Sequence, residues 1–538
     1  MVKIGQERSE LFKFLVSGIF AGSVFFTSDK FVNQTNTPKF YFTLAALLVV
    51  GTVYALMANR IKLISVFPGK TMLWGINIVC VTQACYGLFQ FAGWLSSNSS
   101  KFLITGSFDN PAGFAAVLSL GFPIGIYLAL KTNKIERYLS GTGSMVIALA
   151  VFLSNSRTGV LAILMSSFIF ILFHASIISR LQQLRYYKLL SVSALAFLLP
   201  GSFVLYHQKK DSANGRLLIW EISYEMIKDS PICGHGYGAF QAKYMDYQAK
   251  YFKNNPASKY ELLADNVKHP FNEFIKVAAE FGMIGLALIF LTALFVVWIT
   301  MKLKNDNRSF VLSGLTSFLV FTCFSYPLQY ISVWLLLAVY FSVLLPSEEI
   351  KVRNALIRIT ARSAVIIVFP LFLFLIFRQI EAEMKWKTIA MSSLRGNTKE
   401  MLSEYENLYA TFLKRNPFFL YNYGAELNVA GMYDKSIEVL TECQETFNDY
   451  DLQMLLADNH YKNGAIEKTI QTYKYASNMI PCRFLPLYRL FEIYKNTGQR
   501  DAAMEYAKRI INKKVKIPSS IVSFIQSEAG EFIYKDEQ

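Results

Sequence analysis

The chain has 538 residues, of which 53% are hydrophobic and 15% aromatic, and its mean hydropathy is +0.31. Soluble domains carry about half apolar residues at most, so this composition favours a membrane protein. The net charge of +16 does not require a nucleic-acid partner, because Lys and Arg accumulate in the cytoplasmic loops of membrane proteins. No RNP, zinc-finger or helix-turn-helix motif occurs, so nucleic-acid binding is not expected.

Apolar segments close to the length needed to cross a bilayer, about 20 residues, are spread over the first 380 residues. The first follows basic residues without a small-residue cleavage site, which predicts an uncleaved span rather than a signal peptide. About eleven spans are predicted, at 11–27, 38–57, 72–95, 111–130, 138–154, 158–177, 189–206, 271–300, 309–325, 328–345 and 363–379. The sequence therefore predicts an all-α, polytopic membrane domain over residues 1–380.

The charges of the connecting segments orient these spans. Every second connection is basic, namely 58–71, 131–137, 178–188, 301–308 and 346–362, whereas 28–37 and 96–110 carry one lysine each. Basic loops remain in the cytoplasm. This alternation predicts that the N-terminus is inside, and that the long loop 207–268 and everything after about residue 380 are outside.

Arg157 is the only charged residue between Met145 and Phe173. At the centre of a bilayer it would cost roughly 2.5–3.5 kcal/mol. The predicted topology places it instead in an outward-facing turn, where Ser156 or Thr158 could cap the next helix. Two interpretations remain open: an arginine that anchors a helix end at the membrane surface, and an anion site in which a guanidinium adds to a helix N-terminus.

The outer loop 207–268 contributes Arg216 at the start of a predicted helix. In that helix Leu217, Trp220, Tyr224 and Ile227 form one apolar stripe, which is expected to lie on the membrane or against the bundle. Arg216 taken alone fits a solvated helix end equally well. The glycine-rich segment 231–240 after the helix is more typical of a tight turn than of a phosphate loop.

His269 stands directly before Pro270, which predicts a place in the first turn of the next span, at the outer membrane boundary. A single histidine there is usually a polar end-residue. Arg157 and Arg216 are predicted on the same side of the membrane, however, and a neutral imidazole can act as a general base. The sequence therefore predicts a candidate site of these three residues, with His269 as the catalytic group.

The tail contains a repeat. Gly431, Gly464 and Gly498 are separated by 33 and 34 residues, the period of helix–turn–helix repeats. Three repeats over 417–518 resemble tetratricopeptide repeats, which predicts a helical-repeat domain over 381–538. Such arrays present a concave surface to peptides or protein partners. The alternative interpretation is a module that only stabilises or spaces other parts.

Several motifs together resemble the superfamily of O-antigen ligases, O-antigen polymerases and protein O-oligosaccharyltransferases. They are TGSFDNPAGF at 105–114, SNSRTG at 154–159, GR at 215–216, PICGHGYGAF at 231–240 and HPFNEFIKVAAEFGMIGL at 269–286. The resemblance implies transfer of a glycan from a polyprenyl (undecaprenyl) diphosphate to an acceptor hydroxyl, with inversion and without metal or cofactor. It also implies that Arg157 and Arg216 bind the donor diphosphate, and that His269 is the essential histidine.

The resemblance implies a multi-pass protein of the bacterial inner membrane with a periplasmic active site. The acceptor is expected to be a protein, a lipid A-core or another glycan, and the repeats tilt the expectation towards a protein acceptor or partner. Two alternatives stay open: an O-antigen or capsule chain polymerase, and a transporter of lipid-linked sugar.

Overall fold

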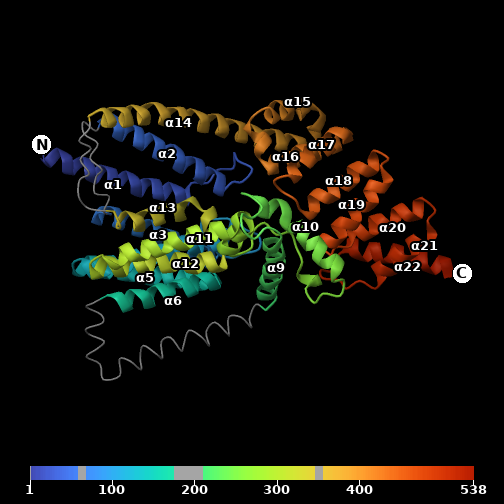
Figure 1. The fold of residues 1–538 in the computed structure, drawn as a ribbon, viewed down its shortest axis with the longest axis horizontal. Coiled ribbons are helices and arrows are strands. Elements are labelled where there is room, and N and C mark those ends of the chain that lie inside the picture. Colours follow the sequence, from blue (N-terminus) through green and yellow to red (C-terminus); the bar gives the residue numbers. More distant parts are fainter. Residues whose placement is uncertain (1, 58–67, 175–209, 346–354, 538) are drawn as a thin grey trace, which may run out of the picture. The chain divides into compact units, whose positions relative to one another are not determined.

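The computed structural model describes residues 2–57, 68–174, 210–345 and 355–537, and every regular element within these ranges is a helix (Figure 1). The prediction of an all-α protein is confirmed for this part of the chain. The chain divides into two compact units. Unit 1 comprises 1–203, 271–273 and 289–387, and unit 2 comprises 204–270, 274–288 and 388–538. The outer loop thus belongs to the same unit as the C-terminal helices.

Unit 1 is a bundle of long apolar helices. They are α1 (Val2–Phe25), α2 (Asn36–Met57), α3 (Lys70–Phe91), α4 (Pro111–Lys131), α5 (Lys134–Leu153), α6 (Arg157–Phe173), α12 (Asn305–Phe324), α13 (Ile331–Ser342) and most of α14 (Ala355–Ser392), together with the second part of α11 (Glu273–Met301). A short 3-10 helix, η2 (Pro327–Gln329), precedes α13.

Helix α4 lies at the centre of unit 1, and most of its side chains are buried. Small residues allow its neighbours to approach: a Cβ on Gly121 would lie 2.4 Å from the Cys80 sulfur of α3, and one on Gly125 would lie 2.3 Å from the Ser144 hydroxyl of α5. Close helix contact through small residues is the usual packing of membrane bundles, where no hydrophobic force draws apolar helices together.

Within the described residues, five helical stretches are long and apolar enough to cross a membrane, namely Asn36–Leu56, Lys70–Phe91, Pro111–Lys131, Glu273–Met301 and Ile359–Tyr409. Shorter apolar helices occur at Phe12–Phe25, Arg157–Phe173 and Ile331–Ser342. These findings confirm a helical membrane protein. The predicted span at 189–206 lies outside the described residues, and the number of eleven spans stays a prediction.

Unit 2 contains the outer loop and a row of helices. The loop forms α9 (Lys210–Asp229), α10 (Ala239–Asn254) and the 3-10 helix η1 (Glu261–Leu263). The C-terminal part forms η3 (Ser393–Asn397), α15 (Thr398–Tyr409), η4 (Phe412–Arg415), α16 (Pro417–Val429), α17 (Tyr433–Gln444), α18 (Tyr450–Lys462), α19 (Ile466–Met479), α20 (Leu485–Asn496), α21 (Arg500–Ile511) and α22 (Ser520–Glu537).

The three glycines of the sequence repeat lie in the turns α16–α17, α18–α19 and α20–α21. Gly431, Gly464 and Gly498 have φ values of 82°, 77° and 72°, which side chains with a Cβ rarely adopt. Each turn closes with the same backbone bond, for example from the Met432 N–H to the Leu427 carbonyl at 2.9 Å. The sequence period thus corresponds to three helix pairs. Their assignment to the tetratricopeptide family stays a prediction.

Helix α11 is broken at Gly282, whose φ of 62° and ψ of −158° are not helical. The glycine-rich segment 231–236 fills the break. Pro231 and Ile232 accept hydrogen bonds from the Met283 and Ile284 amides at 2.8 and 3.2 Å. In return, His235 and Gly236 donate to the Ala279 and Glu280 carbonyls at 2.9 and 2.8 Å. The loop therefore provides the hydrogen bonds that the helix loses at its break.

We expect Gly282→Ala to destabilise the protein by about 1–3 kcal/mol, because a left-handed φ would be imposed on a residue with a Cβ. That Cβ would also lie 2.2 Å from the Ile232 carbonyl oxygen. The measurement is thermal unfolding of the full chain in detergent. Gly215→Ala is the matched control: Gly215 lies within helix α9, where an added Cβ has no neighbour within 4 Å. Its stability should be unchanged or raised by up to about 1 kcal/mol.

Candidate functional site

Arg157 is the first residue of helix α6. Ser156 precedes it in an extended conformation and caps the helix, with its hydroxyl accepting a hydrogen bond from the Gly159 amide at 3.2 Å. This confirms the predicted cap and explains why the helix begins here, because Ser at this position satisfies one of the free N–H groups of the first turn. The guanidinium thus stands at the positive end of the α6 dipole.

The N-terminus of α4 lies beside that of α6. A Cβ on Gly159 would be 2.8 Å from the Ala115 methyl group, and the Ser119 hydroxyl donates to the Gly159 carbonyl at 3.3 Å. At the other end both helices meet Asp306, which pairs with Lys131 of α4 and lies 3.4 Å from His174 after α6. The two helices are therefore parallel, and both direct their N-termini to the end of the bundle that carries Arg157.

Asn110 caps helix α4 at this same end. Its side-chain oxygen accepts from the Ala112 and Gly113 amides at 2.8 and 3.2 Å and from the Tyr330 hydroxyl at 3.1 Å. Its amide group donates to the Tyr326 hydroxyl at 3.3 Å. The sequence marked TGSFDNPAGF as a motif without assigning Asn110 a role. The structure shows that it joins the start of α4 to the segment between α12 and α13.

Lys39 is a buried cation that the sequence analysis missed. Its side chain is 2% exposed, its ammonium donates to the Ser107 carbonyl at 2.6 Å, and it lies 3.8 Å from the centre of the Phe108 ring. Ionisable groups at membrane depth are rare and usually functional. The sequence could have indicated Lys39 by the same criterion that indicated Arg157. Lys39 is the only charged residue of the predicted span 38–57, and Arg157 is the only charged residue of its apolar run.

Arg216 lies in the second turn of α9, since that helix already begins at Lys210; the predicted position at the helix start was wrong. Two members of the predicted apolar stripe do not pack against protein, so of its two predicted places only contact with the membrane stays a prediction. Leu217 and Tyr224 are 45% and 58% exposed, whereas the buried face comprises Leu218, Ile219, Ile222, Ser223 and Met226. Spacing alone could not identify this face, because both sides of the helix carry large apolar residues.

His269 precedes its helix instead of lying in the first turn, because α11 begins only at Glu273. The prediction from Pro270 was wrong, since Phe271 has a φ of 54° and interrupts any helical path. Burial, followed by the nearby charges of Lys276 and Lys268, lowers the pKa of His269 to about 4. The imidazole is therefore neutral near pH 7 and can accept a proton.

Within unit 2 the segments carrying Arg216 and His269 are neighbours. The indole N–H of Trp220 donates to the Pro270 carbonyl at 2.8 Å. Trp220 lies one turn after Arg216 on α9, so both project from similar angles of the helix, and Pro270 is adjacent to His269. Arg157 belongs to unit 1, and the convergence of all three residues stays a prediction.

The glycine-rich segment 231–240 is not a phosphate loop. The His235 and Gly236 amides are bonded to carbonyls of α11, the Gly234 amide donates to the Ser230 carbonyl, and the Ala239 amide at the start of α10 donates to the Gly236 carbonyl. A phosphate loop needs several converging N–H groups that are available to the ligand. In this segment those groups hold the broken helix and the start of α10, which supports the interpretation as a tight structural turn.

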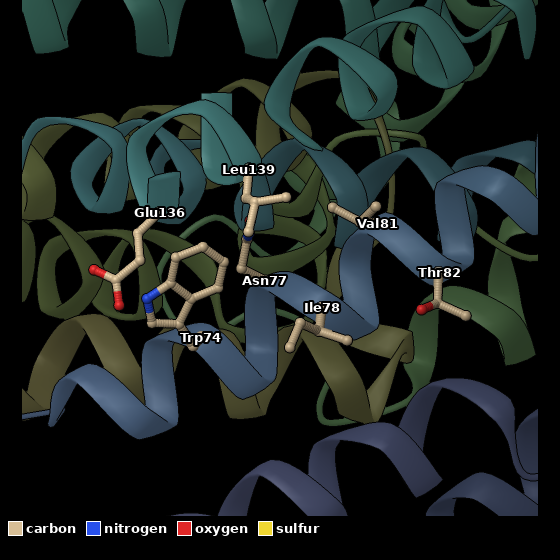
Figure 2. A pocket seen from close by; sticks show the side chains of 7 residues that line it. All are labelled: Trp74, Asn77, Ile78, Val81, Thr82, Glu136 and Leu139. Atoms are coloured by element: carbon tan, nitrogen blue, oxygen red, sulfur yellow. The ribbon is translucent and has the colours of Figure 1, made fainter. Parts of the chain in front are cut away.

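A cavity of about 470 Å³ lies between α3 and α5, lined by Trp74, Asn77, Ile78, Val81, Thr82, Glu136 and Leu139 (Figure 2). Glu136 and Leu139 belong to the first turns of α5, whereas Arg157 follows the other end of that helix. At 1.5 Å per residue the two places are roughly 20 Å apart. This cavity is therefore separate from the Arg157 end of the bundle. Among the described residues, no group of three His, Cys, Asp or Glu side chains is arranged to hold a metal ion.

Residues 142–290 match the family model described as O-antigen ligase. The match confirms, over this segment, the resemblance that the motifs predicted, and the segment includes Arg157, Arg216 and His269. No curated protein matches the chain.

We expect Asn110→Ala to destabilise unit 1 by about 1–2 kcal/mol, because it removes the cap of α4 and the partner of two tyrosine hydroxyls. Asn133→Ala is the matched control, since Asn133 precedes α5 in the same way but makes no capping bond with its side chain. Thermal unfolding of both variants in detergent measures the difference. Equal stabilities would show that the Asn110 bonds contribute nothing.

Proposed function

We propose that this chain is a membrane glycosyltransferase of the O-antigen ligase type, which moves a glycan from a polyprenyl diphosphate to an acceptor hydroxyl. The observation that carries the proposal is that one family match, over 142–290, includes all three residues that the sequence analysis selected on chemical grounds. The proposed location is the bacterial inner membrane, with the active site on the periplasmic face, supported by the alternation of basic loops.

In the proposed reaction the acceptor oxygen forms a bond to the anomeric carbon while the bond from that carbon to the diphosphate oxygen breaks. The electron pair leaves with the diphosphate, whose negative charge increases. Arg157 lies at the adjacent N-termini of α4 and α6, where a guanidinium and two helix dipoles favour an anion. Arg216 is the proposed second cation. Such preorganised charge stabilises a leaving group more strongly than water does.

His269 is the proposed general base. Its neutral imidazole takes the acceptor proton as the new bond forms, and the acceptor attacks opposite the departing diphosphate, which inverts the anomeric centre. The two arginines supply the charge stabilisation that a divalent cation provides in other phosphate chemistry, so we propose a reaction without metal or cofactor.

The acceptor is proposed to be a protein hydroxyl, because a helical-repeat domain predicted on the active-site side suits a protein partner. Lipid A-core and a growing glycan chain are the competing acceptors. The full chain, supplied with an undecaprenyl-diphosphate-linked glycan and each acceptor class separately, would distinguish among them. Transfer to a growing glycan chain alone would identify a polymerase. Movement of the lipid-linked sugar across the membrane without transfer to any acceptor would identify a transporter.

We expect His269→Ala to lower transfer by roughly 10²–10⁴-fold with donor binding retained, because a general base acts only in the chemical step.

Arg157→Ala and Arg216→Ala should weaken binding of undecaprenyl diphosphate by about tenfold or more, because each removes a charge-assisted contact. Arg137→Ala is the control, an exposed arginine of a predicted inner loop. Unchanged turnover in His269→Ala would refute the base assignment.

The pH dependence gives a separate test of His269. Since its pKa is lowered to about 4, the base stays neutral as the pH falls from 8 to 5.5, and turnover should remain nearly constant. An unperturbed histidine, with a pKa near 6.5, would lose about 90% of its neutral form at pH 5.5. Donor binding measured over the same range is the control. An acid limb centred between pH 6 and 7 would contradict a histidine whose pKa is lowered to about 4.

A further inference from the structure

The segment just before His269 lies on the C-terminal helix pairs of unit 2. We call residues 264–268 the strap. Asn266 bonds twice to the start of α18: its amide group donates to the Asp451 carboxylate at 3.0 Å, and its oxygen accepts from the Tyr450 backbone amide at 3.1 Å. Both hydrogen-bonding ends of one side chain are thus used by the same helix.

The other strap residues contact the repeats on both sides of this bond. The Lys268 ammonium lies 4.7 Å from the Phe418 ring centre and 5.4 Å from that of Phe447. The Ala264 carbonyl accepts from the Cys482 thiol at 3.8 Å, and the Asp265 carboxylate lies 3.6 Å from the Arg483 guanidinium. Four of the five strap residues are therefore held by contacts with the C-terminal part of unit 2. These contacts involve all three helix pairs or the segments that directly precede them.

Helix α10 strengthens this attachment. Gln248, which is fully buried, donates to the Met479 carbonyl at 2.6 Å and to the Asp265 carbonyl of the strap at 3.2 Å. Asp246 accepts from the Asn448 amide at 2.6 Å and from the Tyr475 hydroxyl. Buried polar contacts of this kind fix one geometry, because a shifted arrangement would leave a desolvated group without its partner.

We propose that the C-terminal helix pairs act as a positioning element for the transfer reaction, holding His269 in place through the strap. The inference rests on the proposed function for the role of His269, but its geometry comes from unit 2 alone. A loop without a sheet or disulfide has no rigidity of its own. A base displaced by about 1 Å can lose 10²-fold in rate, so a fixed support near His269 has catalytic value. Asn266 is the central positioning residue.

The test exchanges the two polar groups of the central contact. Asn266→Asp places two carboxylates against each other and should lower kcat by roughly tenfold, with binding of undecaprenyl diphosphate unchanged. Adding Asp451→Asn restores the hydrogen bond with its direction reversed, since the new asparagine at 451 donates to the new aspartate at 266. The Tyr450 amide still donates to the side chain at 266. The double variant should therefore recover kcat to within about threefold. Hydrogen exchange of residues 261–270 should rise in the single variant and return in the double variant.

Lys435→Ala is the control, because it removes an ion pair between α17 and Glu406 of α15 that does not involve the strap. Its kcat should not change. Full kcat in Asn266→Asp, or a raised acceptor KM at unchanged kcat, would overturn the positioning role; the second result would assign the strap to acceptor binding. Failure of the double variant to recover would also overturn it. Wild-type turnover in His269→Ala would instead refute the proposed base, so the two failures are distinguishable.

Discussion

Each backbone N–H and C=O group that is removed from water must find a hydrogen-bond partner, and this constraint shapes every irregular segment near the candidate site. At the break of α11 the partners come from residues 231–236. In the loop before α4 they come from side chains: Gln90 bonds the Thr105 and Gly106 amides and the Gly106 carbonyl, and Lys39 bonds the Ser107 carbonyl. In the strap, the Asp265 carbonyl accepts from Gln248 of α10 and the Ala264 carbonyl accepts from the Cys482 thiol. Non-helical backbone is thus held by specific contacts wherever functional residues are expected.

Much of the fold could be predicted because it follows from periodicity and length. Apolar runs marked the helices of unit 1, and the spacing of Gly431, Gly464 and Gly498 marked the turns of the helix pairs. The break at Gly282 could not be predicted, since Gly285 in the same helix stays helical and the break is stabilised by a segment some 50 residues earlier. The grouping of the outer loop with the C-terminal helices depends in the same way on contacts distant in sequence.

Residues of the candidate site could be predicted where their charge stands out against an apolar sequence. Arg157 was identified because it is charged in an apolar run, and its cap by Ser156 followed from local rules. Asn110, Trp220 and Asn266 were missed, because ordinary polar or aromatic residues acquire a role only through their partners. The position of His269 was predicted wrongly, because it lies before its helix instead of in the first turn. The positive φ of Phe271 could not be predicted from its residue type, because phenylalanine rarely adopts this conformation.

The strap has a consequence for how this architecture can change over time. Open helical arrays usually gain or lose whole repeats, because each repeat contacts only its neighbours. In unit 2, a single short segment meets Phe418 of the first pair, Asp451 of the second and Cys482 just before the third. Inserting or deleting one pair would displace these contacts relative to one another. The number of pairs is therefore tied to the length of the loop, and the two can diversify only together.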